Sequence, residues 1–468
     1  MSLNRKYRIL CYTDNDSGRD VEMVLPLRFF AEKFLNCEFI HAFVYDVYAI
    51  YSEKPDLVLL PNTVGSPLYF EISRYAAQQG IKVFALTSEG NFRTDGTFNY
   101  WGYNTDKIFY QEYICLWSSR TRDFLVSQHP ELEDKIVLTG GTGFDRYKIY
   151  DFLTREEYVK IKKLRAYKKV IGYAGWAFGK LYNKQGLEEL LFFFKYDHSR
   201  LTWLEEQRVQ VEGMLKQLIE DNPDTLFILK KHPNENNPSI ITEGLNEMNR
   251  LTDYPNVLYI RDEDNIHDLI HVSDVWLGFE STTAIEAWMM GKQTLLLNPD
   301  PDFNRDRIYK GSVIARNYAE LKNEIDIFYK AGKLTSFYIE DKEKERAAII
   351  SDTIGYGDGL NHIRAGCYLQ RVLESITEEG LKERSYKFSL KFFTMRMLMR
   401  GGSFFYHKKL FSKLYKFKKT IWIFDRFRLP MIQVLFQKIS PALERFYKAN
   451  QIEEKFKNNA LCREIVKK

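Results

Sequence analysis

The chain has 468 residues, enough for about three domains with a sizeable buried core. Its apolar fraction of 45% and charged fraction of 28% are those of an ordinary soluble protein. The net charge of +5 conceals an asymmetry, because residues 381–468 hold 22 Lys and Arg against 6 Asp and Glu. The remainder is acidic, so we expect the last ~90 residues to form a separate part of the protein that meets an anionic partner.

Five scattered cysteines (Cys11, Cys37, Cys115, Cys367 and Cys462) show no paired spacing. This pattern predicts reduced thiols and neither a disulfide framework nor a zinc site. The N-terminal residues lead directly into a strand, and no apolar run approaches the ~20 residues that span a bilayer. We therefore expect a cytoplasmic protein without a signal peptide.

Short apolar runs alternate with helical patterns over residues 1–150. The runs at 7–12, 38–44, 57–60, 82–86, 113–117 and 135–138 predict strands, and 21–34 and 68–79 predict helices. This order predicts β-α-β units with a parallel sheet. The strand at 82–86 is followed by Ser88, Glu89 and Gly90. Glycine permits a tight turn after a strand, so Glu89 can reach a ligand at the end of the sheet.

A second β-α-β series begins at residue 169 and extends to about 380. It contains predicted strands at 169–173, 225–229, 257–260, 274–279 and 294–297, with helices at 203–220, 284–290, 318–331 and 362–376. The predicted fold class is α/β, with two Rossmann-like domains (1–150 and 151–380) facing a cleft.

Polar clusters follow two strands of the second series. The strand at 225–229 leads into His232 and Pro233, and the strand at 274–279 leads into Ser281, Thr282 and Thr283. The ends of parallel strands, with the helix that follows, form the usual ligand edge of an open α/β sheet. Hydroxyl and imidazole donors there predict a phosphate site, most simply for an activated sugar. Each cluster alone is equally consistent with a helix cap or an ordinary turn.

Three motifs in this order resemble those of bacterial CMP-sugar transferases of the GT-B fold, including sialyltransferases and Kdo transferases. The resemblance covers about residues 80–300 and rests on Ser88-Glu89-Gly90, His232-Pro233 and Ser281-Thr282. It implies that Glu89 is the general base and that His232 and the hydroxyl pair bind the CMP phosphate. This chain has Ser88 at the first acidic position, which leaves Glu89 as the one candidate base in the motif. The second and third motifs also resemble CDP-glycerol glycerophosphotransferases, and the domain architecture resembles UDP-GlcNAc 2-epimerases.

Other residues are weaker candidates. Glu286, five residues after Ser281, is placed to hydrogen-bond a ribose, and Gly172 and Gly175 would let the backbone approach a phosphate. His267 and His271 have a zinc-like spacing without a third ligand. Two D-x-D sequences, at 14–16 and 300–302, lack the context of metal-dependent transferases. We expect neither a metal nor another cofactor.

The tail combines an apolar stripe (residues 410, 414, 417, 421 and 424) with a lysine-rich opposite face. That pattern predicts a basic amphipathic helix. We expect residues 381–468 to hold the protein on the anionic inner face of the cell membrane, where lipid-linked acceptors are found. The alternative is that the stripe packs on the body.

The sequence therefore predicts an inverting glycosyltransferase that moves a nonulosonic acid or Kdo from a CMP-activated donor to a surface polysaccharide or lipid-linked acceptor. A CDP-glycerol-type glycerophosphotransferase is the alternative enzyme. A nucleic-acid-binding or scaffold protein is the alternative of another class, and the acidic body argues against nucleic acid.

Overall fold

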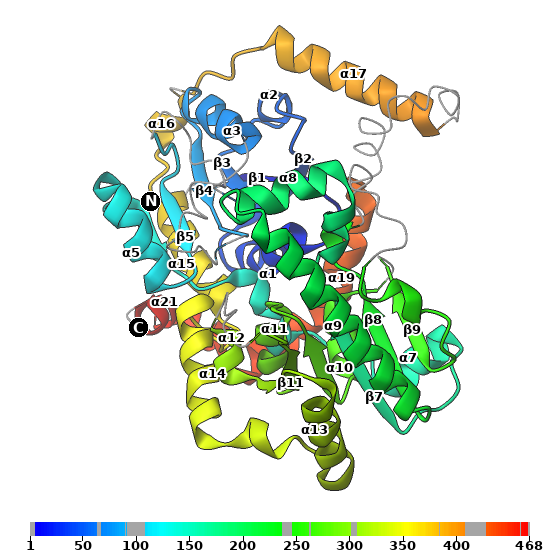
Figure 1. Ribbon diagram of the computed structural model, residues 1–468. Coiled ribbons are helices and arrows are strands. Elements are labelled where there is room, and N and C mark those ends of the chain that lie inside the picture. Colours follow the sequence, from blue (N-terminus) through cyan, green and yellow to red (C-terminus); the bar gives the residue numbers. More distant parts are fainter. Residues whose placement is uncertain are drawn as a thin grey trace. The chain divides into compact units, whose positions relative to one another are not determined.

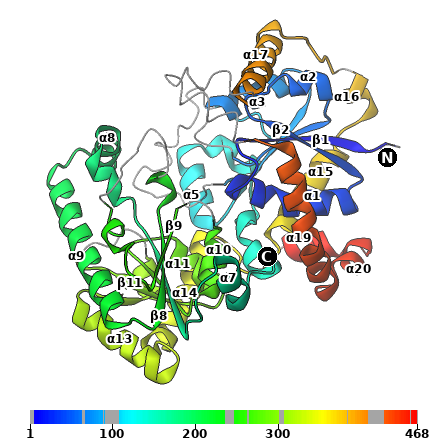
Figure 2. The ribbon, with the colours of Figure 1, turned by 90° about the vertical axis from the view of Figure 1, so that its right-hand side faces the viewer.

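The computed structural model describes residues 5–62, 67–88, 90, 108–235, 246–261, 264–300, 307–382, 384–407, 427–458 and 460–466. The chain divides into two compact units. Unit 1 comprises residues 1–150 and 350–468, and unit 2 comprises residues 151–349. Figures 1 and 2 show their strands and helices.

Unit 1 contains a six-stranded parallel sheet in the order β2-β1-β3-β4-β5-β6. Its strands are β1 (Tyr7–Thr13), β2 (Cys37–Phe43), β3 (Leu57–Leu60), β4 (Lys82–Ala85), β5 (Tyr113–Leu116) and β6 (Ile136–Leu138). The connecting helices are α1 (Arg19–Phe34), α2 (Ala49–Glu53), α3 (Pro67–Ala77), α5 (Ser119–Gln128) and α6 (Arg146–Ile149). The central strands are buried on both faces, as expected for a parallel sheet covered by helices.

Unit 2 contains a second six-stranded parallel sheet, in the order β12-β11-β10-β7-β8-β9. Its strands are β7 (Lys169–Ala174), β8 (Thr225–Lys230), β9 (Val257–Ile260), β10 (Val275–Gly278), β11 (Gln293–Leu297) and β12 (Val313–Ala315). Its helices are α7 (Arg155–Lys162), α8 (Lys184–Phe193), α9 (Ser199–Asp221), α10 (Ile266–Val272), α11 (Thr283–Met289), α12 (Ile308–Gly311) and α13 (Tyr318–Ala331). Helix α14 (Glu340–Thr353) crosses the boundary between the units. The predicted α/β fold with two Rossmann-like sheets is confirmed.

The C-terminal helices belong to unit 1. They are α15 (Asn361–Glu374), α16 (Glu378–Lys382), α17 (Leu390–His407), α19 (Leu429–Ala449), α20 (Ile452–Lys457) and α21 (Leu461–Val466). Residues of α1, α15 and α19 share one apolar core on the first sheet (Figure 2). Helix α15, expected to close the second domain, therefore packs on the first sheet.

The expected separation of residues 381–468 from the body does not hold for α19. Its Ile432, Leu443 and Tyr447 are buried in the core of unit 1. The Tyr447 hydroxyl lies 2.9 Å from Nε2 of buried His362, whose Nδ1 lies 2.8 Å from a carboxylate oxygen of Asp145. The predicted apolar stripe between residues 410 and 424 lies outside the described residues.

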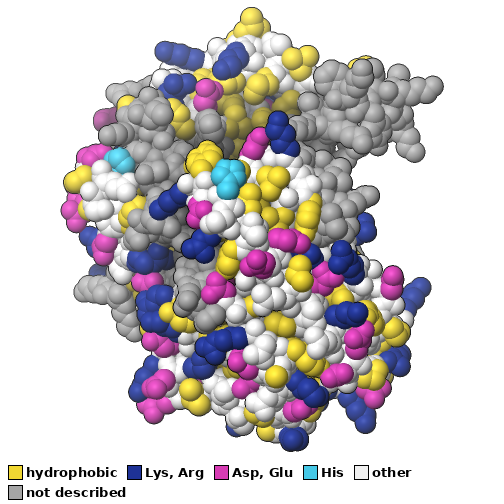
Figure 3. All heavy atoms as spheres, viewed as in Figure 1, with side chains coloured by type: hydrophobic (Ala, Val, Ile, Leu, Met, Phe, Trp, Pro, Cys, Tyr) yellow, Lys and Arg dark blue, Asp and Glu magenta, His cyan; other side chains and the backbone are white. Residues whose placement is uncertain are grey.

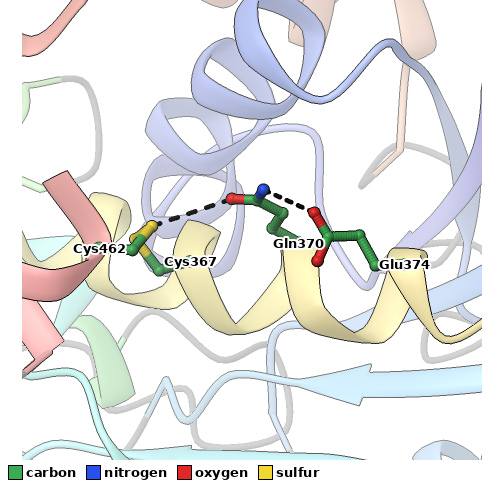
Figure 4. The surroundings of a disulfide bond; sticks show 4 residues. All are labelled: Cys367, Gln370, Glu374 and Cys462. Atoms are coloured by element: carbon green, nitrogen blue, oxygen red, sulfur yellow. Dashed lines mark hydrogen bonds between the residues drawn. A yellow bond between two sulfur atoms is a disulfide. The ribbon is translucent and has the colours of Figure 1, made fainter. Parts of the chain in front are cut away.

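The expectation of five reduced cysteines is wrong for two of them. Cys367 of α15 and Cys462 of α21 form a disulfide, with their Cα atoms 5.6 Å apart (Figure 4). The two residues are 95 positions apart in the sequence, so no local spacing could indicate the pair. Cys11, Cys37 and Cys115 are free and buried. Among the helices that the structure describes, none is long and apolar enough to cross a membrane.

Candidate functional site

The order of the second sheet defines its ligand edge. Strands β7, β8 and β9 follow one another toward one side of the sheet, whereas β10, β11 and β12 follow toward the other. The order in which successive strands are added to the sheet therefore reverses between the neighbouring strands β7 and β10. Open α/β sheets bind ligands outside the carboxyl ends of their strands at such a switch point. The loops that begin at Gly175 and at Phe279 flank this position.

The loop after β10 has a strained backbone. Glu280 is buried and has φ of 41°, in the left-handed region that residues other than glycine and asparagine seldom adopt. This turn brings the Ser281 hydroxyl to 2.9 Å from that of Thr283. Thr283 also accepts a 3.0 Å hydrogen bond from the indole of Trp276, which ties it to the sheet. Ser281 is half-buried and Thr282 is exposed, so these two predicted site residues lie at the surface of the edge.

Helix α11 begins at Thr283 and has only seven residues. The helix dipole is the sum of aligned peptide dipoles. A helix this short therefore contributes less to anion binding than the sequence implied. Any phosphate at this loop must depend mainly on hydroxyl and local amide donors.

His232 lies just beyond β8, in a loop held by its neighbours. The Lys230 ammonium donates to the carbonyl of Arg261, and the Lys231 ammonium donates to the carbonyl of Glu235 at 3.1 Å. The amide of Glu235 donates to the His232 carbonyl at 3.0 Å and starts the short 3-10 turn Pro233–Glu235. His232 is half-buried and Pro233 is exposed.

The sheet places the two predicted clusters on one edge. Strand β7 pairs with both β8 and β10, so the His232 and Ser281 loops follow the strands on either side of β7. Neighbouring strands lie about 4.8 Å apart, which puts the two strand ends roughly 10 Å from each other. A phosphate between them would lie over the Gly175 loop.

Gly175 and Gly172 are glycines for different reasons. A Cβ on Gly175 would lie 2.4 Å from Cε of Met248 and 3.0 Å from the carbonyl oxygen of Lys230, so the backbone here must approach the neighbouring loop closely. Gly172 lies inside β7, and not in a turn after it. A Cβ on Gly172 would lie 2.3 Å from the ring of Trp276, so its lack of a side chain serves packing.

Two buried carboxyl groups, which sequence reasoning missed, connect these loops. Glu247 accepts hydrogen bonds of 3.0 Å from the Tyr173 hydroxyl and the Trp176 amide. Glu235 accepts from the Gly179 amide at 2.6 Å and from the Asn246 side chain at 2.8 Å. Together they join the chain after β7 to the chain after β8.

Burial changes the acidity of both carboxyl groups. Burial, and secondarily the charge of Glu235, raise the pKa of Glu247 to about 8. Burial likewise raises the pKa of Glu235. Glu247 is therefore largely neutral at pH 7, and it can be a donor as well as an acceptor. The nearness of Glu235 to His232 in the sequence was the one available signal for this pair.

The other candidates of unit 2 are Glu286, Asp300 and two histidines. Glu286 is half-buried on α11. Asp300 accepts a 2.7 Å hydrogen bond from the indole of Trp203. His267 and His271 lie on α10 against the ring of Phe152, and Nδ1 of His271 is 2.9 Å from the carbonyl oxygen of Leu153. These contacts give Asp300 and both histidines structural roles.

In unit 1, the predicted base Glu89 lies outside the described residues. Thr87 and Gly90, near Glu89 in the sequence, both contact Trp117. The Trp117 indole donates to the Thr87 carbonyl at 2.6 Å. A Cβ on Gly90 would lie 2.3 Å from the same indole, so the glycine of the motif is required by packing.

The fold is similar to that of other proteins of known structure. No protein-family model matches the chain, and no curated protein matches its sequence. Among solved structures, S. aureus MnaA in complex with UDP superposes with a TM-score of 0.51 at 15% identity, covering 80% of this chain and 98% of that one. UDP-GlcNAc 2-epimerase from Methanocaldococcus jannaschii superposes with a TM-score of 0.50 at 14% identity, covering 79% and 99%. The chain thus has the GT-B-type fold of two Rossmann-like units.

Proposed function

We propose that this protein is an inverting glycosyltransferase that uses a CMP-activated sugar, either a nonulosonic acid or Kdo. The observation that carries the proposal is the arrangement of the second sheet. His232 and the Ser281-Thr282 hydroxyls follow the strands on either side of β7, at the switch point of a Rossmann-type sheet. The fold is similar to that of S. aureus MnaA, which was solved with UDP, and a pyrimidine nucleotide as ligand is in keeping with that complex.

In the proposed reaction, Glu89 removes the proton from the acceptor hydroxyl. The acceptor oxygen then bonds to the anomeric carbon, and the bond from that carbon to the phosphate oxygen breaks on the opposite face. His232 and Ser281 donate hydrogen bonds to the departing phosphate, where negative charge accumulates. Glu286 is the candidate partner for the ribose. The Gly175 amide donates to the Lys230 carbonyl at 2.9 Å, so Gly175 is a candidate only for a close approach of the backbone to the phosphate.

We place the protein on an anionic membrane surface, and α17 adds support from the described residues. Its exposed side chains include Leu390, Met397, Leu398, Phe404 and Phe405. No acidic residue occurs from position 384 to position 407, whereas Lys391 and Arg400 are exposed on this helix. Hydrophobic and basic side chains lie together over α17 in the upper part of Figure 3. Exposed apolar groups beside cations match an anionic bilayer surface.

The opposite side of α17 anchors the helix to unit 1. Arg396 donates to Asp46 at 2.6 Å, and the rings of Phe393 and Tyr48 lie 5.3 Å apart. The exposed apolar side chains of α17 therefore face outward from a helix that is already packed on unit 1.

The test is the turnover of three nucleotide substrates side by side. Purified protein with a CMP-activated sialic acid or Kdo should release CMP faster than it cleaves CDP-glycerol. Faster cleavage of CDP-glycerol would favour the glycerophosphotransferase, and conversion of UDP-GlcNAc would favour a 2-epimerase. Cleavage of none of the three, together with no nucleotide binding, would favour a scaffold protein.

A further inference from the structure

A buried carboxyl group lies against the loop over which the proposed phosphate would bind. Oε1 of Glu247 accepts hydrogen bonds from the Tyr173 hydroxyl and from the Trp176 amide, both at 3.0 Å. Tyr173 lies within β7 and Trp176 lies just beyond its end, so both donors belong to the strand at the switch point. A Cβ on Gly175 would lie 3.3 Å from the same carboxyl oxygen. Glu247 therefore adjoins the backbone that a bound phosphate would approach.

A second carboxyl group joins this cluster to the loop after β8. Oε1 of Glu235 accepts the Gly179 amide at 2.6 Å, and its Oε2 accepts the side-chain amide of Asn246 at 2.8 Å. Asn246 directly precedes Glu247, and Glu235 ends the 3-10 turn that follows His232. Both carboxyl groups are buried. Two acidic side chains thus lie in one buried cluster that holds the β7 and β8 loops together.

The surroundings of the cluster disfavour a second negative charge. The titratable and charged groups that face the two carboxyl groups are two tyrosines and two lysines, namely Tyr173 of β7, Tyr259 of β9, Lys180 and Lys231. The lysines act on Glu235 and not on Glu247. Burial raises the pKa of both tyrosine hydroxyls above their ordinary 10, so they stay neutral up to pH 9. Burial, and secondarily the charge of Glu235, raise the pKa of Glu247 to about 8.

We propose, on the basis of the phosphate site proposed above, that Glu247 is a positioning residue for the nucleotide, and that its carboxyl group must carry a proton for the phosphate to bind. The proton makes one oxygen a hydroxyl and leaves Oε1 as the carbonyl oxygen that accepts both hydrogen bonds. Loss of the proton puts a second negative charge beside Glu235, next to the loop that meets the anionic ligand. Like charges repel most strongly where water is excluded, so the ionised site disfavours a phosphate.

The affinity for CMP should therefore depend on pH. Between pH 7 and pH 9 the protonated fraction of a group with a pKa of about 8 falls from about nine-tenths to about one-tenth, so the Kd should rise about tenfold. The phosphate of CMP has its second pKa near 6, and its charge changes little over this range. At pH 8 about half of the free protein has lost the proton, so binding should take up about half a proton from solution.

The test is calorimetric titration of the full-length protein with CMP at pH 7, 8 and 9, in two buffers of different ionisation enthalpy. The native Kd should rise about tenfold from pH 7 to pH 9, and the binding enthalpy at pH 8 should differ between the buffers. Glu247→Gln keeps Oε1 as an acceptor but has no proton to lose. Its Kd should be the same at pH 7 and pH 9, and its enthalpy at pH 8 should no longer depend on the buffer. Glu188→Gln, on the exposed side of α8, should keep the native profile.

The outcomes separate the role of Glu247 from the phosphate site itself. A native Kd that is equal at pH 7 and pH 9, or a Glu247→Gln variant that follows the native profile, would overturn the role of Glu247 and leave the phosphate site in place. Absence of CMP binding to the native protein at every pH would remove the site, and this role with it. The native profile requires no variant and decides the matter if Glu247→Gln fails to fold. A purely structural role would change the melting temperature without changing how the Kd depends on pH.

Discussion

Raising the pH from 6 to 9 should weaken unit 2, because it ionises Glu247 beneath the ligand edge of the second sheet. This carboxyl group is fully buried, and it accepts hydrogen bonds from the Tyr173 hydroxyl and the Trp176 amide. Its pKa is raised from an ordinary 4.5 to about 8, chiefly by burial. The folded protein therefore binds one proton more than the unfolded chain between these values.

The sign and size of the effect follow from proton linkage. Stability is complete below the unfolded pKa of Glu247 and is lost as the pH rises toward the folded pKa. One proton corresponds to about 1.4 kcal/mol per pH unit, so a rise from pH 6 to pH 9 should cost roughly 2–3 kcal/mol. Glu235 acts in the same direction, because burial raises its pKa as well.

Urea unfolding followed by tryptophan fluorescence at pH 6 and pH 9 measures this loss. Glu247→Gln keeps an oxygen acceptor for Tyr173 and Trp176 but cannot ionise. Its urea midpoint should resemble the native one at pH 6 and exceed it at pH 9. Glu188→Gln, on the exposed side of α8, is the matched control. Native midpoints that agree at pH 6 and pH 9, or a Glu247→Gln variant that weakens in parallel with the native protein, would refute the reasoning.

The other predictions concern the reaction and the membrane. Glu89→Gln should lower turnover by about 10²–10⁴ with nucleotide affinity nearly unchanged, and near-native turnover would assign the base elsewhere. His232→Ala should act mainly on kcat, whereas Ser281→Ala should weaken CMP binding by about 1 kcal/mol, measured by calorimetry. Unchanged kinetics and affinity in both variants would exclude the phosphate site. Leu398→Glu should reduce co-sedimentation with vesicles containing phosphatidylglycerol, while Glu188→Gln should not. Equal sedimentation of both would argue against α17 as the membrane contact.

Much of the fold could be predicted because parallel strands are continuous apolar runs. Eleven of the twelve strands that the structure describes fall where such runs occur, and their ends agree with the runs or differ by one residue. The exception, Val313–Ala315, is only three residues long and lies at the edge of its sheet. A run that short does not differ from the apolar residues of a helix or turn.

The placement of the C-terminal helices could not be predicted from local pattern. An apolar stripe such as Ile432, Ile439, Leu443 and Tyr447 indicates a buried face without saying what covers it. In the structure, α1 and α15 cover it. The Cys367–Cys462 disulfide likewise depends on distant segments that only the fold brings together. The common edge of the His232 and Ser281 loops was predictable, because the carboxyl ends of parallel strands always lie at the same edge of the sheet.

The most direct measurement is hydrogen exchange of the full-length protein with and without CMP, CDP, UDP and GDP, read by mass spectrometry. A nucleotide phosphate bound over β7 should slow exchange in three segments of unit 2, after β7 (175–179), after β8 (230–235) and after β10 (280–284), with CMP or CDP most effective. Ser281→Ala should reduce that protection. Unchanged exchange in all three segments with every nucleotide at millimolar concentration would contradict a phosphate site at this edge.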